Sequence, residues 1–567
     1  MESEISSLLE KNFDAVQIKS EILESYRACQ ARGLLQSTKF FAELLVCLKD
    51  VEVPDDDSFF AEETDKRYLR CFAYFNRREY NRAEYFAKKE KSPKSKFLYY
   101  YSKYQSCETK RADNFGESIG ALVDSRAKDD SLKTLYWEMK NDPDVTKDGY
   151  CLYLFGVVQR IMGLHTLAMV TLQSALKHEP FLWAAWTELS LLPRSRAEVI
   201  SLRLPYNWIT LMFLGKTLTA VDPSLPAVQQ IWSKLETIFP DCPYITTQRA
   251  VSLNARYPPG ADEAQELFMK VREADPCRLD NLDTLSNILF VGEQQEELAK
   301  LAQEMQAVDP HRSETCGVVG NVFSFRRQHA QALLYFKKAI KINVNYFPAW
   351  TFMGHEYAAI KNYHAAVHSY AQAIEVNKRD HRAWASLSLM YEQLKMSSHA
   401  LYYQERAQRL RPTCPQMMFS LAERYEKSAK NDFAALCYSQ AHELAKGNDF
   451  KQASCALYRL ARLYLSIREN EKARFAYENY VKFAWDSRDR TSSPLMTALI
   501  FLCEYYLTRD ADEAQSYLKM LDEIPEGQEA ARRMRDRLRG GSPQAGVSDD
   551  TVDMTDASDS MVLDTSL

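Results

Sequence analysis

Two histidines that stand four residues apart form the first pair of side chains in this sequence that could do chemistry. His364 and His368 have the spacing that places two metal ligands on one face of a helix. The residues between them are Ala-Ala-Val, so the glutamate of the HExxH metalloprotease motif is missing. A zinc site would need further ligands, and the sequence offers none at a metal-binding spacing. We therefore interpret the histidines as a solvated pair and expect no metal or other cofactor.

Catalysis by other side chains finds no better support. His355-Glu356 could act as a base and an acid, but the pair follows Gly354 in a helix-packing pattern, and no Ser or Cys nucleophile accompanies it. The sequence contains no GxxxxGK[ST] or GxGxxG phosphate-binding motif and no kinase signature. Its twelve cysteines include no C-x-x-C pair, which indicates buried, reduced thiols. We expect a protein that is not an enzyme.

The composition points to proteins as partners. The chain of 567 residues has 46% hydrophobic and 26% charged residues and a net charge of -5. A pI near 6.1 gives no basic field that would gather nucleic acid or an anionic membrane. The acidic N-terminus lacks an apolar leader, and no apolar run is long enough to span a bilayer. We expect a protein of the nucleus and cytoplasm that binds neither nucleic acid nor membrane.

The elements that position these side chains are set by a repeat of 34 residues, the length of the two-helix tetratricopeptide unit. Within each unit a large residue, a small residue four positions later and an alanine of the second helix recur at this spacing. The small residues let two antiparallel helices approach closely, and the large ones fill the space toward the next unit. The packing positions that we assign in this way are Trp350, Trp384, Gly320, Gly354, Ala366, Ala400 and Ala434.

A unit of this kind cannot bury its own apolar face, so units must stack. The sequence therefore predicts an all-α protein, a right-handed superhelical solenoid of tetratricopeptide helix pairs. We expect N-terminal repeats over residues 1–240 and a superhelix with a peptide-binding groove over residues 241–540. Residues 541–567 are rich in Gly, Ser, Asp and Thr and predict an acidic disordered tail. Residues 108–148 match the repeat poorly.

First helices line the inner wall of such a superhelix, which places polar and acidic residues in the predicted groove. An extended peptide that carries Arg or Lys would suit this wall, because carboxylates and amides can pair with its cation. Two alternatives stay open. The residues are ordinary solvated groups, or the groove binds a C-terminal carboxylate as a chaperone-tail receptor does, which would need Lys, Arg and Asn projecting into the groove. The wall residues are Asp280, Asp283, Asn287, Asn321, His355 and Glu356.

Several strings of the sequence resemble one family more than generic tetratricopeptide proteins. They include RLDNLDTLSNILFV, ETCGVVGNVFSFRRQHAQALLYFKKAIKIN and NYFPAWTFMGHEYAAIKNYHAAVHSYAQAIEVNKRDHRAW. These strings are similar to subunit eight of the anaphase-promoting complex, or cyclosome, a multisubunit ubiquitin ligase of the cell cycle. The resemblance covers roughly residues 15–535 and is strongest between about 275 and 445.

The resemblance implies a non-catalytic scaffold for mitotic ubiquitination during cell division. Such a subunit forms a homodimer through its N-terminal repeats and stacks against other tetratricopeptide subunits. One groove of that family receives the Arg-containing box near the N-terminus of the coactivator, and the matching positions are Asn321 and Glu356; we extend this role to Asp280, Asp283 and Asn287. A free-standing peptide adaptor such as a co-chaperone is the alternative. Ubiquitin transfer by the purified chain without partners would indicate an enzyme.

Three Ser-Pro dipeptides are candidates for proline-directed phosphorylation, although such dipeptides also occur by chance. The serines are Ser92 and Ser493 in predicted loops and Ser542 in the tail.

Overall fold

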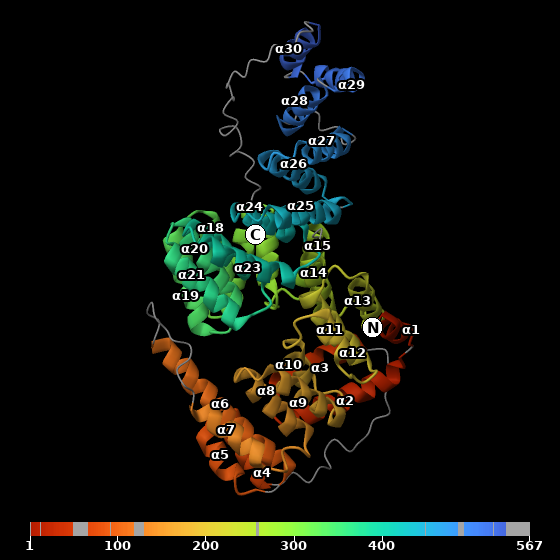
Figure 1. Ribbon diagram of the computed structural model, residues 1–567. Helices are drawn as coiled ribbons and strands as arrows, with labels where there is room; N and C mark the ends of the chain where they lie inside the picture. Colours follow the sequence, from red (N-terminus) through yellow and green to blue (C-terminus); the bar gives the residue numbers. More distant parts are fainter. Residues whose placement is uncertain are drawn as a thin grey trace. The chain divides into compact units, whose positions relative to one another are not determined.

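The computed structural model describes residues 2–11, 13–48, 66–90, 92–117, 130–256, 260–447, 449–485, 493–507, 509–524 and 527–539. Across these ranges it contains thirty α-helices and no strand, which confirms the all-α prediction (Figure 1). None of the described helices is long and apolar enough to cross a membrane. The predicted tail and Ser542 lie outside the described residues.

The chain divides into two compact units, residues 1–356 and 357–567. Unit 1 contains α1 (Glu2–Glu10), α2 (Ala15–Ala31), α3 (Leu35–Cys47), α4 (Lys66–Asn76), α5 (Tyr80–Ala87), α6 (Pro93–Glu117), α7 (Asp130–Asn141), α8 (Gly149–Ile161), α9 (His165–His178), α10 (Trp183–Ser190), α11 (Arg196–Ser201), α12 (Trp208–Val221), α13 (Pro226–Ile238), α14 (Pro243–Ala255), α15 (Ala261–Ala274), α16 (Leu282–Val291), α17 (Gln295–Val308), α18 (Ser313–Phe325), α19 (His329–Ile342) and most of α20 (Phe347–Ala359). Unit 2 contains α21 (Tyr363–Val376), α22 (His381–Gln393), α23 (Ser397–Leu410), α24 (Pro415–Lys427), α25 (Asn431–Ala445), α26 (Phe450–Ser466), α27 (Asn470–Trp485), α28 (Ser493–Leu507), α29 (Ala511–Asp522) and α30 (Gln528–Arg539).

Helices pair along the chain within each unit as the repeat predicts. In unit 1, α8 packs on α9, α14 on α15 and α18 on α19; in unit 2, α22 packs on α23, α24 on α25 and α26 on α27. First helices of successive pairs also touch, for example α6 with α8, α10 with α12 and α16 with α18. This is the nearest-neighbour packing of a repeat stack.

Glycine makes the closest helix contact possible. A Cβ placed on Gly320 of α18 would lie 2.4 Å from the ring of Phe336 in α19. Gly215 of α12 approaches the ring of Trp232 in α13 in the same way, with a Cβ-to-ring distance of 2.8 Å. Because ordinary carbon contacts are about 3.5–4.0 Å, neither helix pair could keep its spacing with a larger residue at these positions.

The other predicted packing positions lie inside their units. Gly354 is buried, and so are Ala366, Ala400 and Ala434, each exposed by 1% or less. The Trp350 indole donates to the Val344 carbonyl oxygen at 3.3 Å, and the Trp384 indole donates to that of Lys378 at 3.1 Å. Each tryptophan thus holds the turn that precedes its own helix. The sequence pattern predicts the alanines and glycines, but it does not predict these indole hydrogen bonds.

The N-terminal helices α1–α3 pack on helices far along the chain in unit 1 (Figure 1). Phe40 of α3 stacks on Trp183 of α10, with ring centroids 4.0 Å apart, and lies edge-on to Tyr244 of α14 at 5.1 Å. The Trp208 indole of α12 donates to the Glu21 carboxylate of α2 at 3.0 Å. Helices α2 and α3 therefore lie across several first helices.

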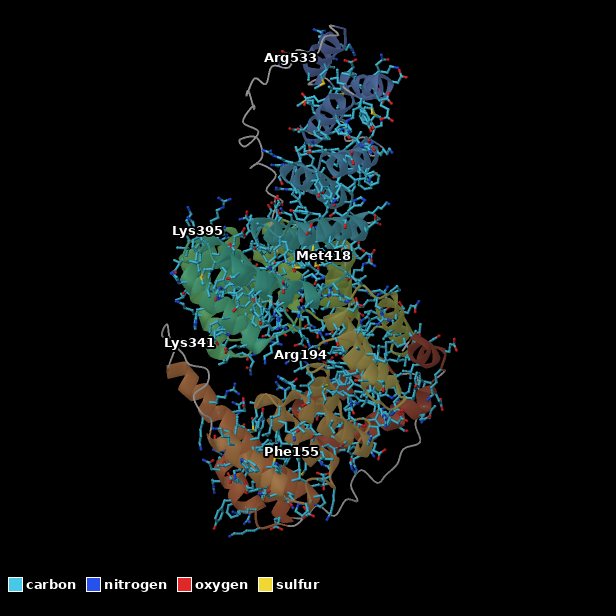
Figure 2. The ribbon with its side chains drawn as sticks, viewed as in Figure 1. Phe155, Arg194, Lys341, Lys395, Met418 and Arg533 are labelled. Carbon is cyan, nitrogen blue, oxygen red and sulfur yellow. The ribbon has the colours of Figure 1, made fainter. Side chains whose placement is uncertain are left out.

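The sequence predicts a boundary at 240/241 and a poor match to the repeat over residues 108–148. The predicted boundary at 240/241 falls between α13 and α14, which pack on one another inside unit 1. A repeat stack gives no structural break there, so that boundary stays a prediction about roles. Residues 108–148, which match the repeat poorly, contain the end of α6 and all of α7. Tyr136 of α7 stacks on Phe155 of α8, with ring centroids 5.6 Å apart, so α7 packs into the repeat stack. Figure 2 labels Phe155.

Candidate functional site

Three successive first helices of unit 1 carry the predicted groove residues. Helix α16 carries Asp283 and Asn287, α18 carries Asn321, and α20 carries His355 and Glu356 (green in Figure 1). Asn321 is 4% exposed, and its amide donates to the Ser286 hydroxyl of α16 at 2.9 Å. The Asn321 side chain therefore links two first helices. Asn287 and His355 are half-buried.

Glu356 is a buried carboxylate, 4% exposed, with partners on two other helices. Ser324 of α18 donates a short hydrogen bond to one of its oxygens. The other oxygen lies 2.7 Å from Nδ1 of His329, the first residue of α19. Ser324 is one helical turn from Asn321, so Asn321 and Glu356 come to the same side of α18. The two partners of this carboxylate are thus a hydroxyl and an imidazole.

Asp280, which precedes α16, has a different environment because it lies among cations. Its carboxylate is 2.9 Å from the Lys39 ammonium of α3 and 2.6 Å from the Arg312 guanidinium. Burial alone would raise the pKa of Asp280, but hydrogen bonds and charge from Lys39 and Arg312 lower it to about 2. Arg312 also pairs with Glu314 at 3.0 Å. The structure therefore places Asp280 in an internal ion-pair cluster.

Arg278 completes this cluster and joins it to the N-terminal helices. Its guanidinium is 3.1 Å from Glu43 of α3 and 3.7 Å from Asp280, and its side chain is only 7% exposed. A buried guanidinium needs such carboxylates, since an unpaired buried charge is costly. Sequence reasoning missed Arg278, Lys39 and Glu43. No local signal could have found them, because α3 is more than two hundred residues away from its partners in sequence.

Among the carboxylates predicted to line the groove, Asp283 is the one whose negative charge is least neutralised by neighbouring cations. Among the described residues, no cation forms an ion pair with it. Burial raises the pKa of Asp283, and its hydrogen bonds with the backbone N–H of Thr284, at 2.9 Å, and the hydroxyl of Tyr346, at 3.4 Å, only partly oppose this. The result is a carboxylate in a position that favours an added cation.

The Tyr346 side chain passes α18 to reach Asp283. It can do so because Gly317 of α18 has no side chain in its path. A Cβ on Gly317 would lie 3.0 Å from the Tyr346 hydroxyl. Sequence reasoning missed Tyr346 as well, but here a signal existed. A second glycine in α18, three residues before Gly320, indicates a close approach from another element.

The remaining candidates are less informative. His364 is exposed and His368 half-buried, and the described residues contain no group of three or more His, Cys, Asp or Glu side chains placed to hold a metal. Ser493 is exposed at the start of α28. Ser92 lies just before α6, and its hydroxyl accepts from the Ser95 backbone N–H at 3.1 Å. A phosphate at either helix N-terminus would be electrostatically favourable. Phosphorylation of Ser92 and Ser493 stays a prediction.

Comparison with protein families gives two matches at different places along the chain. The family model described as anaphase promoting complex subunit 8 / Cdc23 matches residues 17–250. The tetratricopeptide repeat model matches residues 347–380.

Curated relatives carry corresponding names. Anaphase-promoting complex subunit 8 of Dictyostelium discoideum is 34% identical over 411 residues, which cover 71% of this chain and 67% of the relative. The cell division cycle protein 23 homolog of Homo sapiens is 37% identical over 300 residues, or 52% of this chain and 50% of the relative. The match spans about half the length of the plant and mammalian relatives.

A solved structure agrees with the fold. The crystal structure of the APC/C hetero-tetramer Cut9-Hcn1 contains a chain that matches with a TM-score of 0.52 and 15% identity, covering 92% of this chain and 96% of that one. The family model, the relatives and the helix pairs agree, and the chain belongs to the anaphase-promoting complex subunit 8 / Cdc23 family of tetratricopeptide-repeat proteins.

Proposed function

We propose that this protein is a non-catalytic scaffold subunit of the anaphase-promoting complex, an E3 ubiquitin ligase. Membership of the subunit 8 / Cdc23 family is the observation that carries this proposal. The extended run of helix pairs supports it, because repeat stacks present long surfaces for other proteins. The partners are a second copy of the chain, other tetratricopeptide subunits and the coactivator, in the nucleus and cytoplasm.

Recovery of partners from dividing cells tests the scaffold role. The full chain, tagged and purified from mitotic cells, should bring down other tetratricopeptide subunits together with a cullin–RING pair. Recovery of chaperones without ligase subunits would contradict the proposal. Light scattering on the purified full chain should give the mass of a dimer, and a monomer at all concentrations would contradict the homodimer.

The docking of the Arg-containing coactivator box is the finer part of the proposal, and we assign it to Asp283 and Glu356. Asp283 lacks an ion-pair partner among the described residues, and burial makes its charged form costly. Glu356 has one weakly basic neighbour, His329. A guanidinium that reached these carboxylates would donate charge-assisted hydrogen bonds and remove the electrostatic cost. Asn321 and Asn287 offer amide groups on the intervening helices.

Asp280 contributes in another way. Lys39 and Arg312 already neutralise it, so an incoming arginine would have to displace an internal cation. We therefore propose that Asp280 fixes α3 against the first helices and that it does not contact the coactivator peptide.

The co-chaperone alternative is less well supported. A receptor for a terminal carboxylate needs free cations in the groove, but Arg278 and Arg312 are both held by carboxylates. The other residues predicted to line the groove carry no permanent positive charge: Asp283, Asn287, Asn321, His355 and Glu356.

A further inference from the structure

Unit 2 contains a groove between helix α25 and the turn that joins α26 to α27 (these helices are labelled in Figure 1). Its volume is about 490 Å³. The apolar side chains that line it include Ala435, Leu436, Tyr464 and Ile467. The charged side chains that line it are Asp432 of α25, Glu469 of the turn and Lys472 of α27. We call this feature the α25–α27 groove.

Large apolar side chains are exposed at this groove. Leu436 lines it and is 54% exposed. Phe475 lies one helical turn beyond Lys472 on α27 and is 60% exposed. Phe433, one turn before Leu436 on α25, is 58% exposed although its ring stacks on that of Tyr425 of α24 at 5.5 Å. Burial of such side chains is favourable, and an apolar surface rimmed by polar residues marks a site where another protein binds.

The charges of the groove indicate which kind of partner it fits. The Lys472 ammonium pairs with the Glu469 carboxylate at 2.8 Å and lies 5.8 Å from the centre of the Tyr464 ring. Asp432 forms no ion pair within the described part of unit 2. It lies in the first turn of α25, where the helix dipole stabilises its negative charge. The groove therefore has one carboxylate without an ion-pair partner, which a Lys or Arg of a binding protein would neutralise.

We propose that the α25–α27 groove binds an amphipathic helix of another protein, one that carries a large apolar residue and, one turn away on the same face, a Lys or Arg. Asp432 and Leu436 are four positions apart on one face of α25. A partner helix with the same spacing brings its apolar side chain to Leu436 and its cation to Asp432. This site goes beyond the arginine docking proposed above, because it lies on helices of unit 2 and depends on apolar burial.

The tail of this chain is a poorer occupant of the groove. Residues 541–567 include an apolar Met-Val-Leu run, but their charged side chains are all aspartates. These aspartates would meet the carboxylates of Asp432 and Glu469, and like charges repel. We therefore assign the groove to a separate protein, and the test distinguishes that protein from the tail and from a second copy of the chain.

Fluorescence anisotropy with the full chain tests this proposal. The probe is a fluorescein-labelled helical peptide of Ala and Gln that carries two Leu residues, each followed four positions later by Lys. One twin has Ser in place of both Leu residues, and the other has Gln in place of both Lys residues. The parent peptide should bind roughly tenfold tighter than the Ser twin, because apolar burial is lost in the twin. The Gln twin should have an intermediate affinity.

Variants of the chain locate the binding in the groove. Leu436→Ser should weaken the parent peptide by on the order of tenfold, and Phe475→Ser should weaken it less. Asp432→Asn should weaken the parent peptide but not the Gln twin, which has no cation for this carboxylate. The matched control is Leu334→Ser, because Leu334 of α19 is 66% exposed and holds the repeat position of Leu436 three repeats earlier. This control should bind the peptide as the wild-type chain does.

Three results would overturn the proposal directly: equal binding of the parent peptide and the Ser twin, wild-type binding by both Leu436→Ser and Phe475→Ser, or an equal loss in Leu334→Ser. All of these side chains are exposed, so the variants should keep the thermal midpoint of the wild-type chain. A fall in the mass of Leu436→Ser from dimer to monomer in light scattering would assign the groove to a second copy and also overturn the proposal.

Two further variants separate this site from other parts of the chain. Tighter peptide binding by Leu563→Ser would mean that the tail occupies the groove, which would overturn the proposal. Asp283→Asn and Glu356→Gln should bind the parent peptide as the wild-type chain does. A loss in these two variants would mean that the lysines of the peptide bind in the coactivator groove, so the two proposals can fail separately.

Discussion

Substitution of Gly320 by alanine tests the close helix packing on which the stack depends. The new Cβ on α18 would meet Phe336 of α19 at 2.4 Å from Cε1 and 2.8 Å from Cδ1 and Cζ. Phe336 is fully buried, and its ring packs at 5.6 Å from that of Phe352 in α20. The ring therefore has a neighbour behind it and cannot simply turn away into solvent.

The size of the effect follows from these distances. A carbon contact normally needs about 3.5 Å, so the Phe336 ring and the α18 backbone must separate by roughly 1 Å. Overpacking of a buried site costs about 1–3 kcal/mol, and a shift of this size belongs near the upper end. Alanine recovers about 1 kcal/mol through its better helix propensity. Gly320→Ala should therefore destabilise the α18–α19 pair by about 2 kcal/mol.

Hydrogen exchange measured by mass spectrometry suits this prediction better than a global melt, because a long repeat stack need not unfold in one step. Peptides from α18 and α19 should exchange roughly thirtyfold faster in Gly320→Ala, since each 1.4 kcal/mol is a factor of ten. Peptides from α8 and α9 should change least, because these helices pack on one another and the substitution lies in the α18–α19 pair.

A matched glycine provides the control. A Cβ on Gly447, after α25, would meet nothing within 4 Å, so Gly447→Ala should leave exchange unchanged or slower. The double variant Gly320→Ala with Phe336→Leu should be less destabilised than the two single effects added together, because the smaller side chain makes room. Unchanged or slower exchange of α18 in Gly320→Ala would refute the packing argument.

Three further variants test the electrostatics of the site. The pKa of Asp280 is lowered to about 2 in the folded chain, so Asp280→Asn should lower the stability of unit 1 by about 2 kcal/mol at neutral pH. The difference in thermal midpoint between the wild-type chain and the variant should shrink as the pH falls from about 4 to about 2. A difference that persists at low pH would contradict the ion-pair assignment. Burial raises the pKa of Asp283, so the charged carboxylate lowers the stability of the fold once the pH rises above the ordinary pKa of an aspartate. Asp283→Asn should therefore raise the thermal midpoint at about pH 7. A lower midpoint would mean that the charged form is already compensated. Glu356→Gln keeps an oxygen that can accept from Ser324, and its amide NH2 can donate to Nδ1 of His329 in the tautomer that leaves this nitrogen unprotonated. The variant should therefore fold normally yet weaken an Arg-bearing peptide roughly tenfold in an anisotropy titration; unchanged affinity would remove Glu356 from the docking site.

The repeat spacing predicts the helix pairs because the packing of each pair is local in sequence. Gly320 and Phe336, which meet across the α18–α19 pair, are only sixteen positions apart and belong to the same 34-residue repeat. The alanines at 366, 400 and 434 are buried for the same reason. Helices α6 and α7 were harder to predict, since few residues between 108 and 148 occupy the repeat positions although the helices still pack.

The electrostatics of the site could not be predicted in the same way. Asp280 and Asp283 stand three residues apart and look alike in sequence, yet the pKa of one is lowered and that of the other is raised. The difference comes from Lys39 and Arg312, and Lys39 belongs to a helix that returns from the N-terminus. Charge partners of this kind depend on tertiary packing, which a spacing of 34 residues does not encode.

The most direct test of arginine docking is a titration of the full chain with an Arg-bearing coactivator peptide and with the same peptide in which Met replaces Arg. We predict that the chain binds the Arg form at least tenfold tighter, that binding strengthens as the pH rises and Asp283 loses its proton, and that Asp283→Asn removes most of the preference. Equal affinity for the two peptides, or a preference that survives in Asp283→Asn and Glu356→Gln together, would contradict the assignment of this groove.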